Sequence, residues 1–137
     1  AIARSHGAEP VFMITWAYAD RPEMTEELAD AVIAVANANH ALAIPAGLAF
    51  AEAEKFAPDI ALTISDKRHP TPEGSYLLAA VILESVFGIN ARRVSEDCGL
   101  TPETAMILRE IAHKTAVRFF DRPLQSPSQN RVSARKA

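Results

Sequence analysis

Short runs that are apolar on both faces alternate along this chain with longer stretches that are apolar only at intervals. The short runs lie at 11–15, 42–44 and 60–64, and the first is rich in residues that favour strands. A run that is apolar on both faces is typical of a buried parallel strand. We therefore predict a central strand at 11–15, a second short strand at 42–44, and either a strand or an extended segment at 60–64.

The longer stretches carry apolar residues three and four positions apart, which is the spacing of an amphipathic helix. In the first of them, Leu28, Val32, Val35 and Ala36 share one face. The last two begin with a threonine followed by proline, the preferred residues at the N-cap and at the first helical position. Gly88 supplies a stop for the third. The predicted helices cover 24–39, 48–56, 72–87 and 102–119.

Strands and helices alternate in this order, which predicts an α/β layered fold with a largely parallel sheet. Three strands are few for such a sheet. The opening residues 1–10 have no initiator methionine and read like the last turn of a helix, stopped by Gly7. Both observations lead us to expect that this chain is one portion of a larger protein.

Composition narrows the functional classes. The 137 residues fit one domain, and 49% of them are hydrophobic, which is enough for a core. The formal net charge of −3 gives no footprint for nucleic acid. No apolar run approaches the roughly 20 residues of a membrane-spanning helix. The single cysteine, Cys98, excludes an internal disulfide.

The end of the chain differs from the rest. Residues 121–137 hold three arginines and a lysine against Asp121 alone, among Ser, Gln, Asn and Pro. Such a polar basic tail buries little apolar surface, so we expect it to be disordered rather than a binding arm. The folded portion is therefore predicted to cover 1–120.

The segment that most suggests chemistry is Asp66-Lys67-Arg68-His69-Pro70, between the third apolar run and a helix start. Ligands of α/β sheets gather beyond the carboxyl ends of the strands. Asp66 could accept a hydrogen bond from His69 Nδ1 and leave Nε2 as a general base. The alternative is that the two side chains only cap and bridge the loop locally.

Other roles for these residues are weaker. Zinc needs at least three protein ligands, and the other histidines show no second spaced pair, so we expect no metal or cofactor. Trp16, after the first strand, lies next to substrate or simply packs. Arg68 meets an anionic group near the site or is solvated.

Three segments carry a resemblance to one family. They are Thr15-Trp16-Ala17, Ile44-Pro45-Ala46-Gly47-Leu48-Ala49-Phe50, and Asp66-x-x-His69-Pro70 with Gly74-Ser75-Tyr76-Leu77-x-Ala79. They resemble motifs of the SGNH (GDSL-type) hydrolases, which have Pro-Val-Gly-x-Ala-Trp at the second segment. The stretch from Pro10 to Phe119 is similar to the C-terminal half of these enzymes, and most similar to bacterial members catalogued as proteins of unknown function. The resemblance implies a flavodoxin-like three-layer sandwich and a serine that attacks a carboxylic ester, for example a carbohydrate acetyl ester. It also implies that Asp66 orients the base His69.

The family's nucleophile and oxyanion-hole residues have no counterpart here. The nucleophilic serine lies in a Gly-Asp-Ser-like block, and a Gly and an Asn come from two middle blocks. Lys67 stands where the family often has glycine. Without a nucleophile little of the rate remains, so we expect an esterase only if the missing half is present. The alternative is a non-catalytic binding or assembly module. Either form is expected to pair with a second copy or with a complementing N-terminal half. The serines without the family's context are Ser5, Ser65, Ser75, Ser85 and Ser95.

Overall fold

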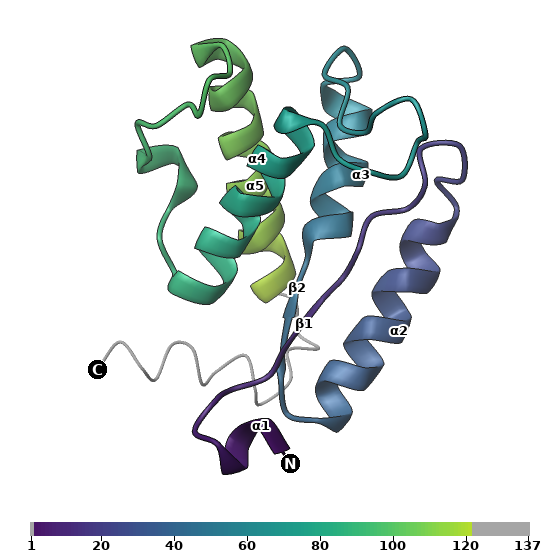
Figure 1. Cartoon of the computed structure of the whole chain (residues 1–137), viewed down its shortest axis with the longest axis vertical. Coiled ribbons are helices and arrows are strands. Elements are labelled where there is room, and N and C mark those ends of the chain that lie inside the picture. The colour runs from purple at the N-terminus through teal and green to yellow at the C-terminus, as the bar shows by residue number, and fades with distance from the viewer. Residues whose placement is uncertain (1, 122–137) are drawn as a thin grey trace.

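The computed structural model describes residues 2–121 of the chain (Figure 1). All but the first residue of the tail predicted at 121–137 lies outside the described residues. The elements are α1 (Ile2–Ser5), β1 (Val11–Met13), α2 (Met24–Ala38), β2 (Leu42–Ile44), α3 (Ala46–Phe56), α4 (Pro72–Ile82), the π-helical turn η1 (Leu83–Phe87), the 3-10 turn η2 (Ala91–Arg93) and α5 (Pro102–Phe120).

The sheet of the described region consists of β1 and β2, which run parallel with Val11 opposite Leu42 and Met13 opposite Ile44. Parallel neighbours need a crossover connection, and α2 provides it. The two predicted strands are therefore confirmed, although the first ends at Met13. The mixed α/β class with a parallel sheet is confirmed as well.

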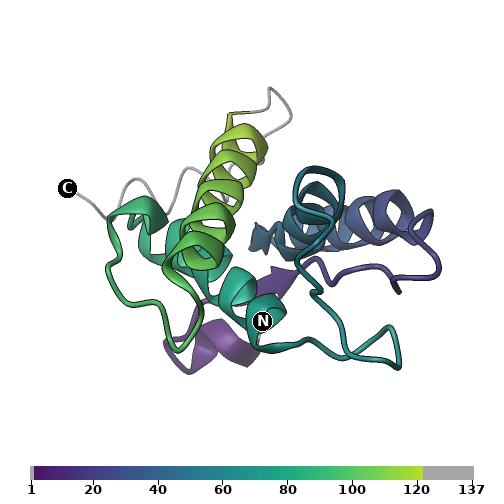
Figure 2. The same ribbon diagram turned by 90° about the horizontal axis from the view of Figure 1, so that it is seen from above.

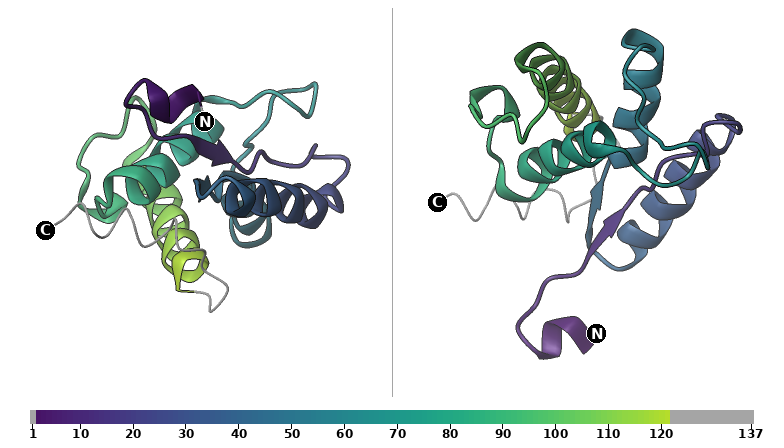
Figure 3. Two further views of the ribbon diagram at one scale, coloured as in Figure 1. Left: turned by 90° about the horizontal axis from the view of Figure 1, so that it is seen from below. Right: turned by 45° about the horizontal axis from the view of Figure 1, so that its top comes forward.

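Helices pack against both faces of this short sheet (Figures 2 and 3). Leu42 and Ile44 point into a cluster with residues of α3, α4 and α5. Ala43 lies between them in the strand and therefore points the other way, into a second cluster with Ile14 and residues of α2. The alternation of side chains along β2 thus divides the core into two parts.

Of the two possibilities left open for residues 60–64, the structure has the extended segment. It forms no strand, and Thr63 makes only a single antiparallel bridge with Pro70. The segment folds back on the residues that precede α4 instead of reaching the sheet. Val11 is 48% exposed, because β2 is the one neighbour that β1 has between residues 2 and 121. Here β1 is an edge strand rather than a central one.

The helices largely follow the prediction, with two differences. In α2 the fully buried residues are Ala29 and Ala36, whereas Val35, predicted to face the core, is 46% exposed. A two-stranded sheet offers a narrow surface, so Val32 and Ile33 pack against it only partly buried and Val35 stays outside the contact. The helix α3 begins at Ala46, directly after Pro45 and two residues before the predicted start.

The predicted helix ends are confirmed. The hydroxyls of Thr71 and Thr101 accept hydrogen bonds from backbone N–H groups three residues later, at 3.1 and 3.2 Å. Gly88 ends η1 in the left-handed region at φ 64°, and Gly7 follows α1 at φ 76°. In α5, residues at helical spacing form the buried face: Leu108, Ile111, Ala112, Thr115 and Phe119. None of the helices between residues 2 and 121 is long and apolar enough to cross a membrane.

Candidate functional site

Three segments that are far apart in the sequence meet beyond the carboxyl ends of β1 and β2. They are residues 15–20 after β1, the first turns of α3 after β2, and the loop 60–71 before α4 (Figure 1). The N–H of Gly47 donates to the carbonyl of Ile14 at 2.7 Å, and the N–H of Ala19 donates to the carbonyl of Lys67 at 3.0 Å. These bonds tie the three segments together.

The close approach of α3 to the first segment depends on Gly47. A Cβ atom at this position would lie 2.2 Å from the carbonyl oxygen of Thr15, well inside any normal contact. A residue without a side chain is therefore needed where α3 begins. The glycine of the 44–50 motif lets the start of α3 lie directly against the residues that follow β1.

The loop 60–71 is built as a short hairpin. The N–H of Ile64 donates to the carbonyl of His69 at 2.9 Å, and the N–H of Thr71 donates to the carbonyl of Leu62 at 3.0 Å. At the tip, the N–H of Lys67 donates back to Ile64 at 2.9 Å. Lys67 has a φ of 63°, a conformation that costs a residue with a side chain free energy.

Asp66 and His69 meet at this tip as predicted. Asp66 Oδ1 accepts hydrogen bonds from the backbone N–H groups of Arg68 (2.9 Å) and His69 (3.0 Å). Asp66 Oδ2 lies 2.5 Å from His69 Nδ1. The two backbone bonds hold the carboxylate in one orientation, so its second oxygen is presented to the imidazole.

These contacts hold Asp66 ionised and decide which ring nitrogen of a neutral His69 carries its proton. The hydrogen bond from the His69 side chain, followed by those from the His69 and Arg68 backbone, lowers the pKa of Asp66 to about 2. Near neutral pH the carboxylate can therefore only accept, so Nδ1 of His69 carries the proton. Nε2 of the neutral imidazole is then an acceptor, and the side chain is 76% exposed. The arrangement can take a proton from a group placed above it.

Both residues predicted to lie near substrate are beside the pair. Trp16 donates from Nε1 to the carbonyl of Arg68 at 2.8 Å, and its ring stacks on Phe50 at 4.5 Å between centroids. The Arg68 guanidinium lies 4.4 Å from the centre of the Tyr18 ring, and its Nη1 donates to the backbone carbonyl of Asp66 at 2.8 Å. Neither contact tests a role in substrate binding.

The contacts made by Phe50 and Tyr18 were not predicted from the sequence. Trp16 and Tyr18 follow β1, and Phe50 follows β2. The carboxyl ends of parallel strands lie at the same edge of a sheet, so the sequence could have predicted that Trp16 and Phe50 lie together. The contact between Arg68 and Tyr18 depends on the hairpin shape of the loop, which carries no comparable signal.

No hydrogen bond joins a serine hydroxyl to His69 within residues 2–121. Ser5 donates to the carbonyl of Ile2 in its own helix at 2.7 Å, and Ser85 is buried in η1, where its hydroxyl has no partner. In the same part of the chain, no group of three or more His, Cys, Asp or Glu side chains is placed to hold a metal ion.

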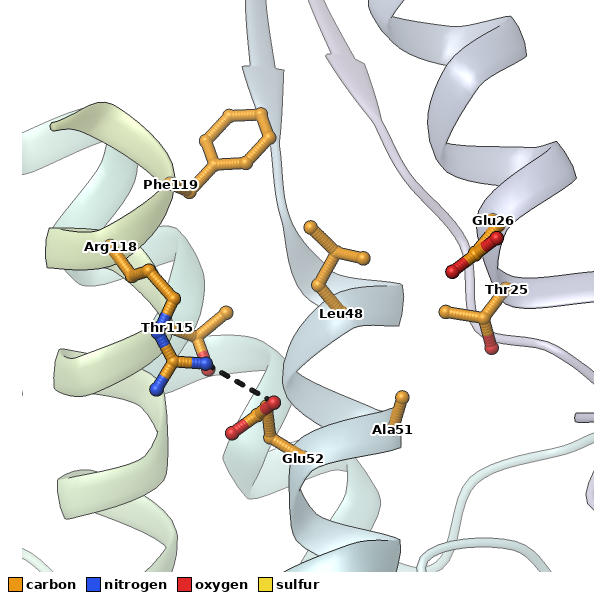
Figure 4. A pocket seen from close by; sticks show the side chains of 8 residues that line it. All are labelled: Thr25, Glu26, Leu48, Ala51, Glu52, Thr115, Arg118 and Phe119. Carbon is orange, nitrogen blue, oxygen red and sulfur yellow. Dashed lines mark ion pairs between the residues drawn. The ribbon is translucent and has the colours of Figure 1, made fainter. Parts of the chain in front are cut away.

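A cavity of about 210 Å³ lies elsewhere, between α2, α3 and α5 (Figure 4). Within its lining, an ion pair at 3.2 Å between Glu52 and Arg118 links α3 to α5. The lining does not include Asp66 or His69, whose side chains are 38% and 76% exposed. The cavity is lined by Thr25, Glu26, Leu48, Ala51, Glu52, Thr115, Arg118 and Phe119.

No family model, curated protein or solved structure matches this chain. Its function is therefore inferred from the residues that meet at the carboxyl ends of β1 and β2.

Proposed function

We propose that this chain supplies the acid–base half of the active site of an SGNH-type serine ester hydrolase. The observation that carries the proposal is the bond between His69 Nδ1 and Asp66 Oδ2, with the opposite side of the imidazole open to solvent. The three segments that resemble family motifs also lie against one another. On this proposal the described residues form the C-terminal part of a flavodoxin-like three-layer sandwich.

In the proposed reaction, His69 Nε2 takes the proton of a serine hydroxyl while the serine oxygen attacks the ester carbonyl. Asp66 stabilises the imidazolium that forms. The imidazolium then gives its proton to the alcohol oxygen as the ester bond breaks, which leaves an acyl-enzyme. A water molecule, deprotonated by the same Nε2, releases the acid. The substrate is a carboxylic ester, and an acetylated carbohydrate suits the resemblance.

The nucleophile and the donors to the oxyanion lie, on this proposal, outside residues 2–121. The described serines are held by their own helices, buried or on the surface, and none is bonded to His69. A Gly-Asp-Ser-like segment would have to bring its hydroxyl to Nε2. Residues 2–121 without that segment are expected to be nearly inert.

A second candidate is a non-catalytic binding or assembly module. The observation that favours it is the edge of β1, which has no further strand among the described residues and exposes Val11. An open edge can pair with a strand of a second copy or of another protein. On this alternative the Asp66–His69 pair only stabilises its loop.

The test uses the protein isolated from its natural source, with its intact mass measured. It is treated with a fluorophosphonate, which labels activated serines, and assayed with p-nitrophenyl acetate. Labelling that His69→Gln abolishes supports the hydrolase, and the labelled peptide identifies the nucleophile. The matched control His6→Gln alters another exposed histidine and should change neither result. Absence of labelling, with equal activity in wild type and His69→Gln, would reject the hydrolase and favour the binding module.

A further inference from the structure

Trp16, the only tryptophan of the chain, connects the core to the tip of the loop 60–71. Its ring lies nearly parallel to that of Phe50, with 10° between the planes, and Phe50 is 2% exposed. From this anchored position Nε1 reaches across 52 residues of sequence to donate to the carbonyl oxygen of Arg68 at 2.8 Å. The indole therefore fixes a loop atom relative to the core.

The bonded carbonyl belongs to the peptide unit that carries the N–H of His69. That N–H donates to Asp66 Oδ1 at 3.0 Å, so the same peptide is held on one side by Trp16 and on the other by Asp66. A peptide unit is planar, and fixing its C=O therefore fixes the direction of its N–H. The orientation of the Asp66 carboxylate is linked in this way to the position of Trp16.

We propose that Trp16 is a positioning residue for the acid–base pair: through the carbonyl of Arg68 it holds Asp66 and His69 in the geometry that general-base chemistry needs. The proposal rests on the function proposed above. Trp16 acts through the backbone, so its role differs from contact with substrate.

The loop's own hydrogen bonds shape its tip, but few contacts fix that tip relative to the rest of the protein. His69 is largely exposed, and Lys67 keeps a positive φ that a side chain disfavours. Besides Trp16, the backbone bond from Ala19 to the carbonyl of Lys67 ties the tip to the residues after β1.

The charged groups around the tip are poor substitutes for this contact. Lys67 and Asp20 are 4.0 Å apart, and both are more than two-fifths exposed. Arg68 rests on the Tyr18 ring, also at the surface. Exposed ion pairs are screened by solvent and contribute little to a defined geometry.

The test is Trp16→Phe, which keeps an aromatic ring for stacking on Phe50 and removes the N–H donor. Carboxyl 13C NMR follows the pKa of Asp66, and imidazole 15N NMR follows the tautomer of His69. We expect the pKa of Asp66 to rise from about 2 toward its ordinary 3.8, and the Nε2–H tautomer of His69 to appear. The double variant Trp16→Phe/Lys67→Gly, in which glycine accepts the positive φ, should restore part of both signals.

The matched control is Tyr76→Phe, which also removes one donor to a backbone carbonyl, that of Glu96 at 2.8 Å. It should leave Asp66 and His69 unchanged even if the fold is somewhat weakened. A folded Trp16→Phe protein in which the pKa of Asp66 stays at about 2 would overturn the proposal.

If Trp16→Phe does not fold, hydrogen exchange of the Trp16 indole N–H is measured in the wild-type protein. Slow exchange supports the bond to the carbonyl of Arg68, and exchange as fast as that of free indole overturns it. The wild-type protein separates the two proposals. A pKa of Asp66 near 3.8 in wild type would remove the acid–base pair itself, and with it the proposed function. A value near 2 in both proteins would remove only the role of Trp16.

Discussion

Replacing Gly47 with alanine tests the contact that brings the site segments together. The new Cβ would lie 2.2 Å from the carbonyl oxygen and 2.8 Å from the carbonyl carbon of Thr15. To reach even 3.0 Å, α3 and the residues after β1 must move apart by close to 0.8 Å. Both contact atoms belong to the backbone, so no side chain can rotate away to relieve the clash.

The expected cost follows from opposing contributions. Alanine favours a helix interior over glycine by about 1 kcal/mol. Overpacking of a close contact costs about 1–3 kcal/mol, and weakening the 2.7 Å bond from the Gly47 N–H to Ile14 costs about 1 kcal/mol more. We therefore expect Gly47→Ala to lower the free energy of unfolding by about 2 kcal/mol, or the Tm by roughly 8 °C.

Urea unfolding followed by tryptophan fluorescence is the assay. Trp16 is the only tryptophan and lies beside the clash, with its Cα 3.2 Å from the new Cβ, so its emission in the folded state should also shift. Gly7→Ala is the control, because its Cβ meets nothing within 4 Å and the cost comes only from a φ of 76°. It should lose about 1 kcal/mol without a change in folded-state emission. If Gly47→Ala is as stable as wild type, α3 does not approach Thr15 as closely as described.

Three further changes should have measurable effects. His69→Gln should raise the pKa of Asp66 from about 2, but not fully to 3.8, because the backbone bonds remain. A carboxyl whose pKa is lowered by folding stabilises the protein above pH 3.8, and this contribution is lost as the pH falls to about 2. Between pH 3.8 and about 2, the urea midpoint of the variant should therefore fall less steeply with pH than that of the wild-type protein. The same pH dependence in both proteins would contradict the pairing of Asp66 with His69. Lys67→Gly should raise the free energy of unfolding, measured with urea, by about 0.5–1 kcal/mol, since glycine accepts the positive φ. A lower free energy of unfolding would show that Lys67 is not strained. Thr115→Val should raise the Tm because it removes a buried hydroxyl that has no partner, a change of roughly 1 kcal/mol, and a lower Tm would mean that this hydroxyl is bonded.

The local features of the fold were readable from the sequence. Thr71-Pro72 and Thr101-Pro102 marked the starts of α4 and α5, and Gly88 marked the end of η1. The bond between Asp66 and His69 was predicted from their spacing as well. All of these depend on atoms within a few residues of one another, where backbone geometry leaves few alternatives.

What the sequence left open or misplaced depends on neighbours that are distant in sequence. An apolar run such as 60–64 looks the same whether it joins a sheet or folds back on a loop, because periodicity does not identify its partner. The exposure of Val11 and of Val35 likewise depends on how many strands the sheet has.

By itself, the sequence determined where α4 and α5 begin, that parallel strands start at Val11 and Leu42, and that a carboxylate and an imidazole share one tight loop. Only the tertiary structure decided where that loop lies. It required the start of α3 to approach Thr15 at Gly47, so that Trp16 could stack on Phe50 and reach Arg68. Local signals act through short-range backbone hydrogen bonds and sterics, whereas the site depends on contacts between segments whose approach is set by packing in three dimensions.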